Sequence, residues 1–147
     1  MPENPTETVE VKGKQIQVGV KFILINPEKK ILLLKRSPEK YPGLGDQWDV
    51  PGGRMKPKVE TIKQAGKREV FAETQLEPTG KYRFLKKQRF SLRPDGPEVT
   101  RLTYLASAEG NPILSEEHTE FLWATLEQAN NLNLDPYLKD VIKELTT

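Results

Sequence analysis

The chain has no cysteine and one histidine among its 147 residues. Without cysteine it has no disulfide framework, no zinc–thiolate site and no cysteine nucleophile. No apolar run approaches the roughly eighteen residues that a transmembrane helix needs. The N-terminus is polar and acidic and lacks the basic-then-apolar pattern of a signal peptide. These absences favour a cytoplasmic protein that does not associate with a membrane.

Neither sign of charge dominates. Lysine and arginine total 23 against 21 for aspartate and glutamate, which gives a formal net charge of +2. This balance does not predict a nucleic-acid partner, whereas a small anionic substrate remains compatible because local charge matters more than the total. The length favours a single domain over residues 14–147, preceded by a loose, flexible arm over residues 1–13 that is rich in proline, glutamate and threonine.

The hydrophobic pattern predicts a mixture of strands and helices. Period-two alternation predicts a strand over residues 15–25, with residues 31–35 as its hairpin partner across an Asn-Pro turn. Further strands are expected over residues 48–50, 81–93, 98–108 and 120–124. Helices are expected to begin near residues 60–61, 126 and 136. Because these elements lack regular βαβ alternation, they favour an α+β domain in which helices flank a mixed sheet.

The most informative stretch runs from Trp48 to Leu76 and passes through a Pro-Gly-Gly turn. Within it, Glu69 and Glu73 stand four residues apart, so a helix places both carboxylates on one face. Like charges at this spacing cost a few tenths of a kcal/mol. Arg68 is one group that could offset the cost, and a divalent cation such as Mg²⁺ is another, since hard cations prefer oxygen ligands. The residues alone leave open a solvated helix face or a metal site.

This stretch resembles the Nudix box, Gly-x5-Glu-x7-Arg-Glu-U-x-Glu-Glu-x-Gly-U, where U is a bulky aliphatic residue. Arg68-Glu69 fall on the Arg-Glu pair, and Glu60 lies at the required distance before them. Glu73 takes the second position of the Glu-Glu pair, and Leu76 takes the last U. The resemblance implies a Nudix-like α/β/α sandwich with a mixed sheet flanked by helices.

Three departures weaken the match. The loop before Glu60 is one residue longer than the pattern, and Ala72 replaces the first glutamate of the Glu-Glu pair. Gln75 stands where the pattern has glycine, and a non-glycine residue in the left-handed conformation expected there costs about 1 kcal/mol. Gly66 inside the helix costs about as much relative to alanine. Two functions therefore stay open: an enzyme with a degenerate box, or a Nudix-fold protein that only binds a nucleotide or a partner.

The resemblance implies a reaction and a set of residues. Nudix enzymes hydrolyse a nucleoside diphosphate linked to another moiety, such as a nucleoside triphosphate or a nucleotide sugar, with Mg²⁺ or Mn²⁺. Glu69, Glu73 and the Gly52 carbonyl are the expected metal ligands, and Glu69 and Arg68 are expected in the catalytic box. Glu60 and Arg68 are expected to pair across the loop–helix junction. Homodimers are common in this family.

A second resemblance concerns relatives that hydrolyse GDP-mannose at the sugar carbon and also lack one box glutamate. His118 falls at the position of their catalytic base, Glu117 at that of a glutamine ligand, and Arg54 at that of an arginine after the Gly-Gly pair. Arg54 and Arg36 are expected to bind substrate phosphates, with a solvated charge as the alternative for each. A lone histidine is often structural, so attack at phosphorus and attack at the sugar carbon both stay open.

Overall fold

The computed structural model describes residues 7–91 and 93–146. Within that part of the chain there are eight strands and three helices. In chain order they are β1 (Thr8–Val11), β2 (Lys14–Ile25), β3 (Ile31–Arg36), β4 (Trp48–Asp49), β5 (Gly52–Arg54), α1 (Ile62–Thr74), β6 (Thr79–Ser91), β7 (Glu98–Ser107), β8 (His118–Ala124), α2 (Leu126–Asn130) and α3 (Pro136–Leu145). None of these helices is long and apolar enough to cross a membrane.

The strands form one mixed sheet in the order β4-β3-β2-β7-β6, with β1 and β5 paired to β2 and β8 paired to β3. β2 and β7 run parallel from Ile16↔Glu98 to Ile25↔Ser107, whereas the other pairs are antiparallel. The predicted mixed sheet is confirmed. The β2–β3 hairpin is correct only at its turn, because Ile25↔Ile31 is the pairing between these strands and they then diverge to other partners.

The N-terminal arm needs a correction. Residues 8–11 form β1 and pair with β2, from Thr8↔Gln17 to Val11↔Lys14. A strand forms there because its backbone groups extend the ladder along the first part of β2. The prediction of a loose arm is therefore wrong for this segment, and residues 1–6 lie outside the described part of the chain.

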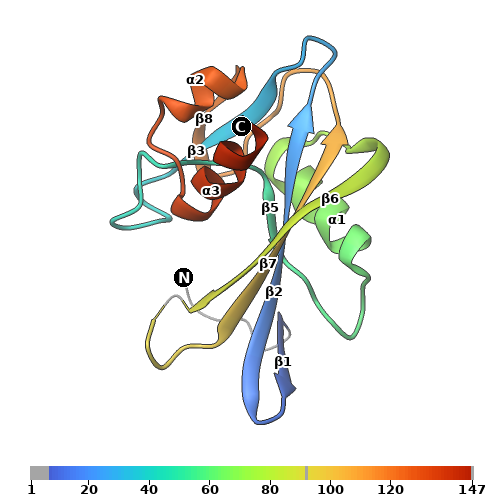
Figure 1. The fold of residues 1–147 in the computed structure, drawn as a ribbon, viewed down its shortest axis with the longest axis vertical. Helices are drawn as coiled ribbons and strands as arrows, with labels where there is room; N and C mark the ends of the chain where they lie inside the picture. Colours follow the sequence, from blue (N-terminus) through green and yellow to red (C-terminus); the bar gives the residue numbers. More distant parts are fainter. Residues whose placement is uncertain (1–6, 92, 147) are drawn as a thin grey trace.

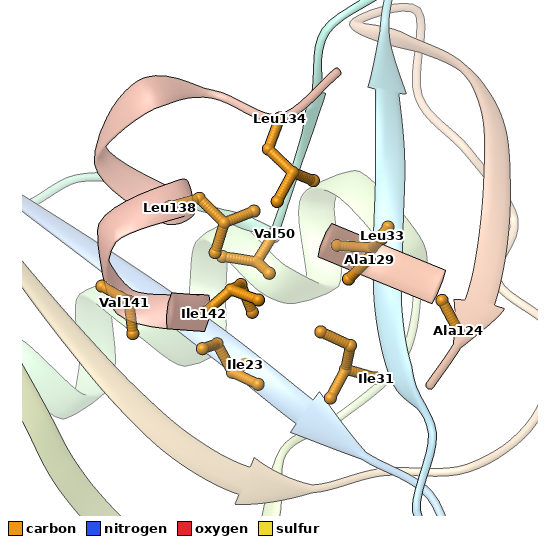
Figure 2. Close-up of a cluster of buried hydrophobic side chains, with 10 residues drawn as sticks. All are labelled: Ile23, Ile31, Leu33, Val50, Ala124, Ala129, Leu134, Leu138, Val141 and Ile142. Atoms are coloured by element: carbon orange, nitrogen blue, oxygen red, sulfur yellow. The ribbon is translucent and has the colours of Figure 1, made fainter. Parts of the chain in front are cut away.

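Helices cover both faces of the sheet: α1 lies on one side of the long strands and α2 and α3 lie on the other (Figure 1). The alternation along β2 explains the two layers, because Val20 and Phe22 pack into the core under α1 while Ile23 packs into the core under α3. Figure 2 shows the second core, where Leu138 and Ile142 of α3 lie over the sheet. The predicted α/β/α sandwich is confirmed.

Local sequence signals set the position of α1. Thr61 caps it through a capping box with Gln64, and Gln75 ends it in the left-handed conformation at φ 59°. Gly66 allows the helix to lie directly against β2, since a Cβ there would be 2.1 Å from a ring carbon of Phe22. The cost of a glycine inside the helix is thus offset by close packing of α1 against the sheet.

Candidate functional site

The Gly-Gly turn brings β5 into direct contact with α1. The Gly52 N–H donates a hydrogen bond to Glu73 Oε1 at 3.0 Å. A Cβ on Gly52 would lie 2.1 Å from the Val20 carbonyl oxygen, and one on Gly53 would lie 2.5 Å from the Glu69 carboxylate. Both glycines are therefore required by close approach. The two box glutamates lie on the face of α1 that contacts this turn, as their spacing predicts.

Arg68 connects α1 to the loop that precedes it. Its Nε and Nη2 donate to the two carboxylate oxygens of Glu60 at 3.0 and 2.8 Å, which confirms the predicted pairing. Its Nη1 donates to Glu69 Oε1 at 2.6 Å, and its Nη2 also reaches the Arg54 carbonyl at 3.1 Å. Hydrogen bonds from Arg68 lower the pKa of Glu60. Arg68 therefore holds Glu69 in place and fixes the loop before α1.

A second segment adds two side chains to Glu73. Ligand atoms of Glu73, Glu117 and His118 all lie within 4.8 Å of one another. The segment that leads to Glu117 and His118 is hydrogen-bonded to the end of α1. The Ser115 N–H donates to the Glu73 carbonyl, and the Ile113 N–H donates to the Thr74 carbonyl. The structure thus brings together Glu73 and His118, which sequence analysis singled out from distant segments. Glu117, which the resemblance to the GDP-mannose-hydrolysing relatives also singles out, joins them.

The electrostatics of this cluster follow from its burial. Burial is the largest effect on Glu73 and, together with the Glu117 charge, raises its pKa well above the usual range despite opposing effects of Lys21 and the Gly52 N–H. Burial and the Lys21 charge lower the pKa of His118 to about 4, so its imidazole is neutral at pH 7. Within the described chain, Nδ1 of His118 is buried without a hydrogen-bond partner. Tyr41 donates its hydroxyl to Glu117 Oε2 at 3.3 Å.

These residues fit a divalent cation. Carboxylate oxygens suit Mg²⁺ and Mn²⁺, and a neutral imidazole nitrogen is a common metal ligand. A buried carboxylate with a raised pKa and a buried imidazole nitrogen without a partner both gain from a nearby cation. Ala72 is exposed on α1. Glu117 brings a carboxylate from a different segment beside Glu73.

The structure gives Arg36 a structural position in place of the predicted substrate contact. Its Nη2 lies 2.7 Å from Asp49 and 2.9 Å from Asp135, and its Nη1 donates to the Gln47 side chain. The side chain is 9% exposed, so the guanidinium is buried and already has partners. The substrate-binding prediction for this residue is not supported. The cause is that β3 directs its last side chain into the interior beside Asp49.

Arg54 is half-buried on β5 and donates from Nε to Gln17 Oε1 at 3.1 Å. Burial, followed by the charge of Arg101, lowers its pKa. Sequence reasoning missed Arg101, as well as Lys21, whose Nζ lies 3.1 Å from Asp49. Lys21 stands between the apolar positions Val20 and Phe22, where period-two alternation predicts a polar residue, so no local signal identifies its pairing with Asp49. Arg101 has no such local signal either.

A wide hollow of about 670 Å³ lies at the other end of β2 and β7. Its lining includes Ile25, Tyr82 and Phe84 together with the cations Lys29, Lys81 and Arg83. None of the box residues lines it. The chemistry-bearing side chains are those at the Gly-Gly turn, so the size of this hollow does not make it the candidate site.

Comparison with known proteins places the chain in a family. The family model of the NUDIX domain matches residues 15–145. The chain belongs to the Nudix family. No curated protein matches the chain in sequence.

Solved structures confirm the fold. The MutT protein of Methanosarcina mazei Go1 is 26% identical with a TM-score of 0.76, over 93% of this chain and 96% of that one. The ORF135 protein of E. coli is 20% identical with a TM-score of 0.77, over 94% of each chain. An Ap4A hydrolase of C. elegans is 21% identical with a TM-score of 0.65, over 88% of this chain and 95% of that one.

Proposed function

We propose that this protein is a divalent-cation-dependent hydrolase that cleaves a nucleoside diphosphate linked to another moiety. The observation that carries the proposal is the convergence of Glu73, Glu117 and His118 within 4.8 Å. This cluster adjoins the Gly-Gly turn, where Glu69 is fixed by Arg68. MutT proteins and an Ap4A hydrolase among the similar structures are consistent with nucleotide substrates.

Glu69, Glu73 and Glu117 are the residues that would hold the cation, Mg²⁺ or Mn²⁺, with the Gly52 carbonyl as a further ligand. Such a cation neutralises phosphate charge and lowers the pKa of a bound water. In the metal-free protein the raised pKa of Glu73 favours its protonated form. Metal binding is therefore expected to release a proton from the buried carboxyl of Glu73.

His118 is the proposed base. It is neutral at pH 7 because its pKa is lowered to about 4, and its Nδ1 has no hydrogen-bond partner within the described chain. A neutral imidazole can accept a proton from water, although a pKa this low makes it a weak base until substrate charge raises the pKa. Removing the His118 imidazole therefore tests whether water attacks at the sugar carbon.

The second candidate is a protein that binds a nucleotide or a partner without cleaving it. The exposed Ala72 and the left-handed Gln75 favour this alternative, because both weaken the box relative to its full pattern. The two candidates differ in whether the protein cleaves the bound nucleotide. Only the enzyme predicts turnover that depends on Glu69 and Glu73.

The test is incubation with nucleoside triphosphates, nucleotide sugars and Ap4A, in Mg²⁺ and in EDTA, with chromatography of the products. We expect cleavage of at least one compound in Mg²⁺, none in EDTA, and at least a roughly tenfold loss of rate for Glu69→Gln. Glu116→Gln is the matched control, because that side chain is 86% exposed on the same loop as Glu117. Tight nucleotide binding without turnover, unchanged by Glu69→Gln, would establish the binding protein instead.

His118→Ala separates the two reaction types. Loss of turnover with nucleotide sugars alone would support attack at the sugar carbon. Full turnover by this variant on every substrate would exclude His118 as the base.

A further inference from the structure

The hollow at the far end of the sheet lies beside a bulge in β6. This end, where β2 turns into β3, is at the top of Figure 1. Thr79 of β6 pairs with Ser107 of β7, and the next pair is Arg83 with Leu105. Three residues of β6 therefore stand opposite Ala106 alone. Bulges bend a strand, re-aim its side chains and recur beside functional sites. The hollow that accompanies this bulge, about 670 Å³, has the size of a small-molecule pocket.

The lining of the hollow includes apolar side chains that the fold leaves partly exposed. Ile25 and Leu105 both line it, and neither is fully buried. Both also pack against the edge of the core under α3, so that core holds them in place. An apolar group resting on these two side chains would remove their remaining surface from water, which is favourable in proportion to the area covered.

Three exposed cations, Lys29, Lys81 and Arg83, also line the hollow. Among the described residues, none of the three forms an ion pair, and no carboxylate lines the hollow with them. Other cations of β6 do have carboxylate partners, since Lys86 pairs with Glu144 and Arg89 with Glu98. Positive charge that is left uncompensated beside apolar surface favours an anion with an apolar part.

The backbone holds Lys29 in an unusual conformation at the edge of the hollow. Its φ is 66°, in the left-handed region that glycine and asparagine adopt more readily. The turn is fixed by Asn26, whose Oδ1 accepts the N–H groups of Glu28 and Lys30. Strained residues of this kind cluster at ligand-binding sites. The turn therefore keeps a cation at this edge at a cost to the backbone.

A smaller hollow of about 290 Å³ continues from the first and shares Ile25, Lys29 and Ser107 with it. Its lining includes one carboxylate, Glu109. The charge of Glu109 repels an anionic group at this end. The anionic group of a ligand therefore belongs on the β6 side of the larger hollow, and the apolar part belongs on its floor.

We propose that the larger hollow binds a small organic phosphate with an apolar body. A phosphate monoester carries a charge of about −1.5 to −2 at pH 7 and has three acceptor oxygens, which suits Lys81 and Arg83 better than a singly charged carboxylate does. Its alkyl or aryl group would cover Ile25 and Leu105. The ligand is a free small molecule, because an apolar body long enough to anchor in a membrane exceeds the floor of the hollow.

This site is separate from the catalytic turn. Ile25 lies four residues along β2 from Lys21, the partner of Gly52. That spacing corresponds to about 13 Å of strand. Neither Glu73 nor His118 lines the hollow. The proposal therefore does not depend on the proposed function, and binding at this site requires neither a divalent cation nor turnover.

The probe is hexyl phosphate in EDTA, titrated into ¹⁵N-labelled protein and followed by amide chemical shifts. We expect saturable shifts at the amides of Lys29, Gly80 and Ser107, and none at Gly52 or Gly53. Inorganic phosphate and hexanol carry the two halves of the probe separately. Each is expected to bind at least about tenfold more weakly than hexyl phosphate, because each lacks one of the two interactions.

Two variants test the lining. Replacing both Lys81 and Arg83 by glutamine should weaken binding about tenfold or more, because charge-assisted hydrogen bonds to the phosphate are lost. Ser107→Phe keeps every charge and fills the hollow from an exposed position, and it should weaken binding by a similar factor. Lys87→Gln is the matched control, since Lys87 is exposed on β6 and does not line the hollow. It should change the affinity less than about twofold.

Several results would overturn the proposal. Shifts confined to Gly52 and Gly53 would place the phosphate at the catalytic turn. Equal weakening by Lys87→Gln would indicate diffuse charge, and equal affinity for inorganic phosphate would mean that the apolar floor has no part in binding. Wild-type affinity in Ser107→Phe would show that the hollow is not occupied. Binding to phosphatidic acid vesicles without binding to hexyl phosphate would assign this face to a membrane surface instead.

Discussion

Replacing Glu73 by glutamine should stabilise the metal-free protein while removing its stabilisation by Mg²⁺. Glu73 is 5% exposed, and its Oε1 accepts the Gly52 N–H at 3.0 Å, a contact that a glutamine oxygen can keep. Burial raises the pKa of Glu73 well above the usual range. A carboxyl whose pKa is higher in the folded state lowers the stability of the fold as pH rises above the unfolded pKa. Glutamine has no such cost.

The expected magnitude follows from these contacts. Replacing a buried carboxyl that the fold keeps protonated, while keeping its hydrogen bond, is worth on the order of 1 kcal/mol. For a chain of this size that raises the Tm by about 3 °C. In the wild-type protein, Mg²⁺ at about one hundred times its Kd adds about 2.7 kcal/mol, or about 8 °C. The variant should therefore melt higher than wild type in EDTA and lower than wild type in Mg²⁺.

The assay is thermal unfolding at pH 8 in EDTA and in Mg²⁺, with Glu116→Gln as the control. A charge-neutralising change on an exposed side chain should leave both melting temperatures near those of wild type. If Glu73→Gln were less stable than wild type in EDTA, Glu73 would be a stabilising structural residue. An undiminished response to Mg²⁺ would show that the cation binds elsewhere.

Three further changes test the packing and the electrostatics. Gln75→Gly should raise the free energy of unfolding by about 1 kcal/mol, since Gln75 is left-handed at φ 59°; an unchanged urea midpoint would refute this. Gly66→Ala should lower the free energy of unfolding by about 1–3 kcal/mol, because the new Cβ would lie 2.1 Å from the Phe22 ring. An unchanged free energy of unfolding would mean that α1 shifts away from β2 without cost. The lowered pKa of His118, about 4, predicts stability that is complete above the unfolded value near 6.5 and declines as pH falls toward 4, by up to about 3 kcal/mol. His118→Gln should flatten that part of the urea-unfolding pH profile, and an unchanged profile would mean that His118 is not buried as a neutral group.

The parts of the site that sequence analysis predicted depend on short-range spacing. Glu69 and Glu73 face the Gly-Gly turn because one helical turn separates them, and Glu60 meets Arg68 because the loop before α1 returns the chain to its first turns. The left-handed Gln75 follows from its place at the helix end. Each of these features spans at most 21 residues of chain, where helical periodicity and turn chemistry decide the geometry.

The parts that were missed depend on contacts between distant segments. Arg36 appeared free to bind substrate because its partners Asp49 and Asp135 lie 13 and 99 residues away in the chain. Arg101 faces Gly19 only because β2 and β7 pair in parallel, across a connection that includes α1 and β6. Register between such strands depends on the packing of both faces, which local patterns do not encode.

The central claim is that Glu73 and Glu117 hold a cation although Ala72 replaces one box glutamate. Titration with Mn²⁺, followed by electron paramagnetic resonance, tests this without any substrate. The account predicts saturable binding to the wild-type protein that weakens at least about tenfold in Glu117→Gln and persists in Glu116→Gln. Wild-type affinity in Glu117→Gln would contradict it and would return the site to the two glutamates of the box alone.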